Sequence, residues 1–308
     1  MVRLSVIALA FGLARICSAE APYPLSAPAG TVGPDYVYDV RASDDFDDAA
    51  LDERKWDDWI ASFQGRSCGF LFARDNVSVS NGCLNLTARL LRPEEKTVEN
   101  RRRGFDTYAT ALVRAKEKTL YGYYECRARS MRACVCNAFW LYDPLSDRPE
   151  RKFRPGDFTE EIDIFELFGK PSAHPPIEDD VTRRHYATAH RLRTPYLEGI
   201  VNGGAQELAD NAGETVVPFD FWDGYHTYGF NWTKTNLTWY ADGVAVFSRT
   251  NDFFHRPLHV TFDCEIMYSW GGEPDRSDLP QAFSIDYFRY WRLDETRHDG
   301  DSPRTDRK

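Results

Sequence analysis

Three acidic residues lie close together in an apolar segment that reads TEEIDIFELFG. Successive side chains of a β-strand alternate between its two faces, so Glu161 and Asp163 share one face while the isoleucines occupy the other. Strict alternation would also turn Glu166 toward the isoleucines, where a lone carboxylate is costly to bury. A one-residue β-bulge near Ile164–Phe165 would return Glu166 to the face of the other two acids, and such bulges are common beside active sites.

Two carboxyl groups about 5–5.5 Å apart suit hydrolysis of a glycosidic bond with retention of configuration. One attacks the anomeric carbon, while the other protonates the leaving oxygen and later activates water. Like-charged neighbours raise the pKa of this second group and keep it protonated. An exposed acidic strand or a calcium-binding strand is the alternative interpretation, but the apolar residues interleaved with the acids place the other side of this strand in a core.

Short runs rich in β-branched and aromatic residues alternate with Gly, Asp, Asn and Pro turns, and helical periodicity is almost absent. Asp242-Gly243 and Asn81-Gly82 each predict a hairpin. This pattern predicts an all-β fold, a two-sheet sandwich or jelly roll, with a closed barrel as the lesser alternative. The clearest predicted strands are 76–91, 107–117, 121–130, 137–143, 160–168, 184–192, 226–240, 244–249, 258–268 and 283–293.

The chain of 308 residues divides into four parts. Residues 1–19 resemble a signal peptide, with Arg3 before an apolar run that is too short to span a membrane. Residues 20–35 look like a flexible leader, 36–293 form one patterned domain, and the polar residues 294–308 predict a disordered tail. We therefore expect a secreted, monomeric protein. The net charge of −10 argues against nucleic acid or an anionic membrane as partner.

An even number of cysteines remains after signal removal, which predicts disulfides in an oxidising compartment. Their spacing matches no zinc pattern and does not choose a connectivity. The six are Cys68, Cys83, Cys126, Cys134, Cys136 and Cys264. Four Asn-x-Ser/Thr sequons fit a glycosylated secretory protein, at Asn76, Asn85, Asn231 and Asn236.

The segment Glu-Ile-Asp-Ile-Phe-Glu resembles the signature of family 16 glycoside hydrolases in its bulged form. The resemblance implies Glu161 as nucleophile, Asp163 as its assistant and Glu166 as general acid/base. It continues in order along the block, through DDF and LDERKW near residue 50, YGYYECRAR at 121–129, AFWL at 138–141, WYADG at 239–243 and IDYFR at 285–289. The implied fold is a concanavalin A-like jelly roll of two bent antiparallel sheets, with a polysaccharide cleft on the concave sheet.

Sugar rings stack on aromatic faces and polar groups take their hydroxyls. The resemblance accordingly implies a substrate-binding shell of Trp140, Arg127, His190 and Glu265. The alternatives are a core tryptophan, an arginine without a role, and polar residues satisfied within a sheet. Eight tryptophans in a sandwich must largely be core, so Trp56, Trp59 and Trp270 are weaker candidates.

Laminarinase-like members carry Gly and Met where this chain has Glu160 and Phe165, so the resemblance is closer to agarase- and porphyranase-like members. It therefore implies a β-linked galactan. Sulfate could be recognised by Arg66, Arg127 or Arg129, because a guanidinium suits bidentate contact with an oxyanion. The reaction requires no cofactor, although the resemblance implies a structural calcium ion with Asp286 as ligand. The alternatives to hydrolysis of a galactan are hydrolysis of a β-1,3-glucan, transglycosylation, and carbohydrate binding without catalysis on the same fold.

Overall fold

The computed structural model describes residues 22–66, 69–143, 158–172, 180–193, 206–207 and 212–294. Within them the chain forms two β-sheets and one α-helix, α1 (Val98–Arg102). Three short 3-10 helices, η1 (Arg74–Asn76), η2 (Pro93–Glu95) and η4 (Arg276–Asp278), complete the regular structure of these residues. No helix among them is long and apolar enough to cross a membrane.

The larger sheet, called sheet 1, has 11 strands. Its pairs are antiparallel except for β4 and β7, which run parallel. In spatial order its strands are β17 (Val244–Thr250), β16 (Asn236–Ala241), β15 (His226–Trp232), β9 (Gly122–Arg129), β19 (Gln281–Leu293), β6 (Cys83–Leu90), β7 (Tyr108–Thr110), β4 (Phe70–Phe72) and β3 (Gly65–Arg66), with β1 (Tyr36–Tyr38) beside β19 and β5 (Val77–Ser80) beside β6.

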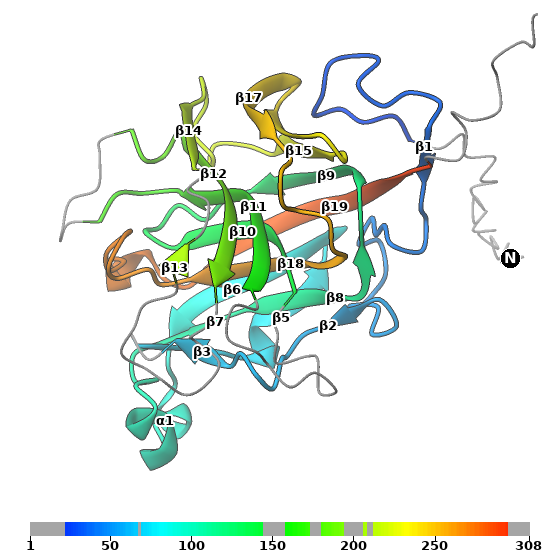
Figure 1. Cartoon of the computed structure of the whole chain (residues 1–308). Coiled ribbons are helices and arrows are strands. Elements are labelled where there is room, and N and C mark those ends of the chain that lie inside the picture. The colour runs from blue at the N-terminus through cyan, green and yellow to red at the C-terminus, as the bar shows by residue number, and fades with distance from the viewer. Residues whose placement is uncertain are drawn as a thin grey trace, which may run out of the picture.

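The second sheet, called sheet 2, has eight strands and carries the acidic segment on β11. The order is β13 (Gln206–Glu207), β12 (Arg184–Arg193), β11 (Phe158–Phe168), β10 (Cys136–Tyr142), β18 (Leu258–Glu265), β8 (Leu112–Thr119) and β2 (Trp56–Asp57), with β14 (Gly213–Val216) beside β12. Figure 1 shows the two sheets as layers, with α1 outside them. Two open sheets confirm the sandwich and exclude the closed barrel.

One continuous apolar core fills the space between the sheets. Phe139 of β10 stacks on Phe262 of β18 at 4.6 Å between ring centroids, and both meet the edge of Phe288 of β19 at 5.8 and 5.9 Å. These rings join sheet 2 to sheet 1, so the alternate residues of each strand must face outward. Each sheet therefore has an outer face, turned away from this core.

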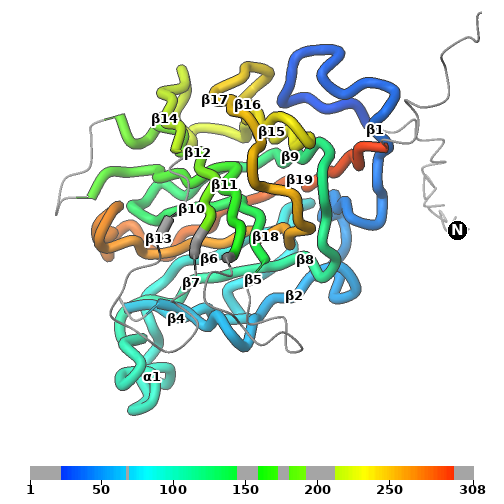
Figure 2. Tube along the Cα trace, in the orientation of Figure 1, coloured from blue at the N-terminus to red at the C-terminus, as the bar shows by residue number. Residues whose placement is uncertain are grey.

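Both predicted hairpins are confirmed. Asn81-Gly82 joins β5 to β6, and Asp242-Gly243 joins β16 to β17. All four turn residues have positive φ (55° and 70°, 44° and 83°), the conformation that favours Asn, Asp and Gly in tight hairpins. The first and last strands of the described chain lie next to each other, because β1 pairs with the end of β19. Figure 2 shows the blue strand β1 beside the red end of the tube.

The leader differs from its prediction, because residues 22–35 pack against sheet 1. Ser26 is fully buried, and its N–H and hydroxyl both donate to Oε2 of Glu125, at 2.7 and 2.6 Å. The N–H of Leu25 donates to the same oxygen at 2.7 Å. A buried carboxylate needs such donors, and the leader supplies them. The predicted signal peptide and residues 295–308 of the predicted tail lie outside the described residues.

The disulfide prediction is wrong for the five cysteines that the structure describes, all of which are buried free thiols. Two of these thiols contact polar groups instead of another cysteine. Cys134 donates to the carbonyl of Gly271 at 2.9 Å, and the sulfur of Cys83 lies 3.3 Å from the hydroxyl of Tyr225. Cys68 lies outside the described residues.

The four sequons differ in exposure. Asn76 is 3% exposed and its amide donates to the carbonyls of Thr87 and Thr110, so its side chain is buried and hydrogen-bonded in the folded protein. Asn85 and Asn231 are partly buried, whereas Asn236 is exposed at the start of β16. Glycosylation stays a prediction.

Candidate active site

The three acids of β11 share the outer face of sheet 2, and a bulge makes this happen. Ile164 and Phe165 are consecutive in sequence, yet both are fully buried in the core. Pairing with β12 shifts register between Asp163 and Glu166, and pairing with β10 shifts at the same point. Two consecutive inward side chains reverse the alternation, so Glu166 points outward with Glu161 and Asp163. The predicted bulge is confirmed.

Register brings residues of neighbouring strands into rows on this outer face, which we call the carboxyl face. Residues directly opposite each other in a ladder project to the same side of the sheet. Three successive rows hold the acids and their neighbours: His259, Tyr142, Glu161 and His190; Thr261, Trp140, Asp163 and Thr188; Asp263, Ala138, Glu166 and Tyr186. Of the predicted shell, the structure thus places Trp140 and His190 on the face that holds the acids.

His190 contacts the middle acid directly. Its Nε2 lies 3.3 Å from Oδ2 of Asp163. One ligand atom each from His190, Asp163 and Glu161 lie within 4.8 Å of one another, so these three are the group in the described chain close enough to share a metal ion. The predicted nucleophile, Glu161, is one of the three, and the other two are its neighbours. The sheet itself fixes this arrangement, because His190 and Glu161 are paired across β12 and β11.

Burial and neighbouring charge raise the pKa of both glutamates. Burial, and then Asp163, raise the pKa of Glu161 to about 8, while His190 and Arg66 act in the opposite direction. Burial raises the pKa of Glu166 well above its usual value, with added contributions from Asp163 and Glu161. Each ionised glutamate opposes ionisation of the other, so this face keeps a proton to higher pH than an isolated glutamate would.

Two more acidic residues, Asp263 and Glu265, lie on β18 near the three acids of β11. Glu265 is 2% exposed, and Nε of Arg66 donates to its Oε2. Burial and the neighbouring Glu265 raise the pKa of Asp263 well above its usual value. Burial also raises the pKa of Glu265, against the lowering effect of Arg66. Arg66 was considered in the sequence only for sulfate, and Asp263 was not singled out, because nothing in the spacing of residues 66 and 265 reveals their contact.

Two buried polar atoms on the carboxyl face have no hydrogen-bond partner among the described residues. They are Nε1 of Trp140, a donor, and Oε1 of Glu265, an acceptor. Buried polar groups are nearly always satisfied, so such atoms in a site suggest that a bound molecule completes them. The ring of Trp140 lies 5.4 Å from that of Tyr142, which adds a second aromatic side chain to this face.

Arg127 and Asp286 do not join this site. Both project from the outer face of sheet 1, and Nη1 of Arg127 donates to Oδ2 of Asp286 at 2.7 Å. The expectation that Arg127 contacts substrate beside the acids is therefore contradicted by its position on the other sheet. The pairing also fits a calcium ion poorly, since a guanidinium already occupies one oxygen of the expected ligand and would repel the ion.

Trp239 is a residue of the site that sequence reasoning missed. It belongs to β16 of sheet 1 and is fully buried, yet its Nε1 donates across the core to the backbone carbonyl of Asp163 at 2.9 Å. This bond holds the strand where the bulge begins. Its only signal in the sequence is the WYADG segment, which served as a landmark for the hairpin that follows.

Cys136 was noted only as a candidate for disulfide bonding. Its thiol lies 3.7 Å from Oε1 of Glu166. Burial raises the pKa of Cys136 well above its usual value, so the group stays a neutral, weak donor toward this carboxyl.

The family model for the GH16 domain of beta-porphyranases A–D matches residues 36–293. The chain therefore belongs to the GH16 family of glycoside hydrolases. GH16 relatives include the kappa-carrageenase of Pseudoalteromonas carrageenovora, 26% identical over 287 residues that cover 87% of this chain and 67% of the relative. Beta-porphyranase B of Zobellia galactanivorans is 28% identical over 263 residues, covering 83% and 84% of the two chains.

Solved GH16 structures share the fold. The beta-porphyranase of the human gut bacterium Bacteroides plebeius superposes with a TM-score of 0.68 at 21% identity, covering 85% of this chain and 94% of that one. A kappa-carrageenase from Zobellia galactanivorans gives 0.67 at 22% identity, covering 88% and 100%. The jelly-roll sandwich predicted for this GH16 glycoside hydrolase is confirmed.

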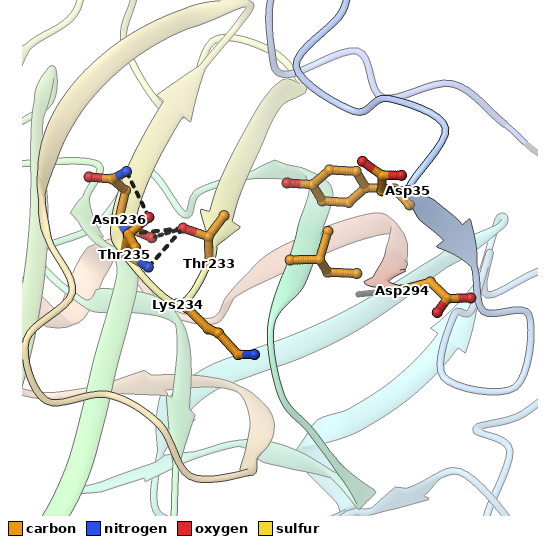
Figure 3. Close-up of a pocket in the computed structure, with 8 residues that line it drawn as sticks. Asp35, Thr233, Lys234, Thr235, Asn236 and Asp294 are labelled. Atoms are coloured by element: carbon orange, nitrogen blue, oxygen red, sulfur yellow. Dashed lines mark hydrogen bonds between the residues drawn. The ribbon is translucent and has the colours of Figure 1, made fainter. Parts of the chain in front are cut away.

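A pocket of about 560 Å³ lies away from the acids, between the start of β1, the turn from β15 to β16 and the end of β19. Figure 3 shows Thr233, Thr235 and Asn236 on one side of it and Asp35 and Asp294 on the other. The hydroxyl of Thr233 accepts the N–H groups of Thr235 and Asn236, at 3.3 and 2.9 Å, which shapes the turn. Since none of the acids of β11 lines this pocket, it is not the reaction site of the GH16 fold.

Proposed function

We propose that the protein is a secreted, monomeric endo-glycosidase that hydrolyses a β-linked, sulfated galactan of the agar–porphyran type with retention of configuration. The observation that carries the proposal is the bulge at Ile164–Phe165, which brings Glu161, Asp163 and Glu166 to one face in a GH16 chain. All three acids expected of a catalytic member are present, which argues against a protein that only binds carbohydrate.

In the proposed reaction Glu161 is the nucleophile, because it is the first glutamate of the Glu-Ile-Asp-Ile-Phe-Glu segment that resembles the GH16 signature. Its carboxylate attacks the anomeric carbon and forms a glycosyl ester as the glycosidic bond breaks. Glu166, held protonated by its raised pKa, gives its proton to the leaving oxygen. The resulting carboxylate then takes a proton from the water that hydrolyses the ester.

Asp163 and His190 are proposed to orient the nucleophile. Asp163 lies between the two glutamates, and its contact with His190 limits the freedom of its carboxyl group. These groups supply both the nucleophile and the proton, so we propose that the reaction needs no cofactor.

The proposed substrate rests on the polar groups around the acids. The Nη groups of Arg66 form no hydrogen bond with the described residues, and its side chain is 48% exposed, which suits contact with a sulfate ester. Nε1 of Trp140 and Oε1 of Glu265 offer one donor and one acceptor to sugar oxygens and hydroxyls. The names of the relatives, kappa-carrageenase and beta-porphyranase, agree with a sulfated galactan.

Two experiments test the proposal. A screen for reducing ends released from porphyran, agarose, κ-carrageenan, laminarin and mixed-linkage glucan should give the highest rate on a sulfated galactan, and a higher rate on laminarin would overturn the substrate. NMR of the first product should show a β-anomer, whereas an α-anomer would exclude the retaining mechanism. Products longer than the substrate would favour transglycosylation, and binding without any cleavage would favour a lectin. Export, which the predicted signal peptide supports, is tested by recovering the protein from the medium of its producing cell.

A further inference from the structure

Three arginines follow one another at the end of β9, two on the outer face of sheet 1 and one in the loop that follows. Arg127 and Arg129 project outward from β9, because Cys126 and Ala128 between and beside them are buried in the core. Arg132 follows in the loop after β9. Arg127 and Arg129 take no part in the proposed reaction, because they project from the outer face of sheet 1 whereas the acids project from the outer face of sheet 2, with the core between the two sheets. The backbone of Arg132 lies against Gly169, just beyond the end of β11.

Two aromatic residues of one loop hold these arginines. The guanidinium carbons of Arg127 and Arg129 lie 4.8 and 5.2 Å from the ring centroid of Tyr225, and that of Arg132 lies 4.1 Å from Trp222. Stacking fixes the plane of a guanidinium and leaves its N–H edges directed away from the ring. We call these five residues the arginine patch.

The backbone beneath the patch is also fixed. The side chain of Gln281, the first residue of β19, accepts the N–H of Arg132 at 2.7 Å and donates to its carbonyl at 3.1 Å. Exposed arginines usually lose much side-chain entropy when they bind a ligand. Here the contacts with the two rings reduce the side-chain cost in advance, while the double hydrogen bond fixes the backbone of Arg132.

The patch carries unneutralised positive charge in an acidic protein. Arg127 pairs with Asp286 at 2.7 Å, whereas the exposed guanidiniums of Arg129 and Arg132 form no ion pair with any described residue. Asp223, in the loop that carries Trp222 and Tyr225, is exposed. The chain as a whole has a net charge of −10, so a local excess of positive charge on one face stands out from its surroundings.

We propose that the arginine patch is a second binding surface for a sulfated polysaccharide, separate from the site of hydrolysis. This inference rests on the proposed function for its ligand class. Guanidinium edges form bidentate, charge-assisted hydrogen bonds with sulfate oxygens, and two unpaired arginines offer two such contacts. A chain or segment bound here stays attached while another is cut at the carboxyl face, which raises the local concentration of substrate.

Sulfated polysaccharide is favoured over nucleic acid and anionic membranes. The net charge of −10 gives the protein no long-range attraction to either of those polyanions. A sulfated galactan that is the substrate is instead already bound at the carboxyl face. The weak contacts of the patch then form within the same enzyme–polysaccharide complex.

Affinity electrophoresis in gels containing κ-carrageenan tests the patch. The protein is the full chain carrying Glu161→Gln, which prevents digestion, compared with the same chain carrying Arg129→Gln and Arg132→Gln in addition. Arg101→Gln with Arg102→Gln, on exposed α1, is the matched control with the same change of charge. Mobilities are normalised to gels without polymer.

The patch variant should lose on the order of fivefold in affinity for κ-carrageenan, because exposed ion pairs contribute little individually, and the control should lose less than twofold. Equal losses in both variants, or an equal loss in agarose gels, would overturn the assignment to sulfate. An equally patch-dependent affinity for duplex DNA or phosphatidylserine vesicles would replace it with a general polyanion surface.

Kinetics supply a second readout with an active enzyme. Arg129→Gln with Arg132→Gln should raise KM on polymeric substrate several-fold while leaving kcat/KM on a short oligosaccharide unchanged, and an equal change on both would contradict a separate surface. Absence of cleavage of any sulfated galactan by the wild-type protein would sink the proposed function alone, because the binding assay needs no turnover.

Discussion

Glu125 and Glu166 are both carboxyl groups on outer faces of the sandwich, one on each sheet. Glu125 is fully buried and accepts from Leu25, Ser26 and Tyr287, so backbone and hydroxyl donors surround it. Glu166 is partly exposed, has a weak thiol donor and lies among other acids; burial, and then these acids, raise its pKa. The supply of donors therefore distinguishes the structural carboxyl group from the candidate reactive acid.

The sharpest test of this comparison is loss of the nucleophile. Glu161→Gln should lower kcat by about 10⁴-fold or more, since the variant cannot form the glycosyl ester. The reducing-end assay measures the loss. A variant with a smaller side chain at this position, Glu161→Ala, should regain turnover when azide is added as an external nucleophile. Glu125→Gln is the control and should keep kcat within about twofold; full activity in Glu161→Gln would end the assignment.

The reverse test concerns stability. Glu125→Ala removes the acceptor for the leader, leaving buried donors on Leu25 and Ser26 unpaired, which should cost about 3 kcal/mol of unfolding free energy. Urea unfolding gives the value. If Glu125→Ala lowered kcat and left the free energy of unfolding unchanged, Glu125 would not be a purely structural group.

The acids of the carboxyl face should themselves cost stability at neutral pH. The pKa of Glu161 rises from about 4.5 unfolded to about 8 folded, so the folded state binds the extra proton between these values, and stability falls as pH rises from 4.5 to 8. Glu161→Gln should remove this fall and be more stable than wild type at pH 8, on the order of 2 kcal/mol. Urea unfolding at several pH values measures it; parallel curves for the two proteins would contradict the raised pKa.

The smallest expected effect concerns the bond across the core. Trp239→Phe loses the hydrogen bond to the carbonyl of Asp163 and should lower kcat about fivefold by loosening the bulge. Trp232 provides a matched control, because it is equally buried and donates to a backbone carbonyl at Phe254. Trp232→Phe should lose similar stability with kcat unchanged; equal losses of kcat would reduce Trp239 to a general packing role.

Local pattern was enough to predict the longer strands, the two hairpins and the bulge, because alternation and turn chemistry depend on neighbours in sequence. It missed the short strands β1 to β4, β13 and β14, and it merged β15 with β16 into one run. The bulge followed from one conflict, a glutamate assigned to an apolar face. Contacts between distant residues were beyond reach: Arg66 meets Glu265, Trp239 supports Asp163, and Ser26 satisfies Glu125. Arg127 was misplaced because its role was carried over from the family resemblance, and nothing in the sequence showed that its strand belongs to the sheet without the acids.

The two consecutive inward residues of β11 have a consequence for how such a site changes over evolutionary time. The orientation of Glu166 depends on whether an odd or an even number of residues separates it from Asp163, and the bulge is what accommodates that number. Deletion of one of the two residues between Asp163 and Glu166 would leave a regular strand in which alternation alone turns both side chains to the same face. The bulge would then no longer be needed. Families of this kind can therefore exchange bulged and regular forms of the catalytic strand by insertion or deletion, a step that no series of substitutions reproduces.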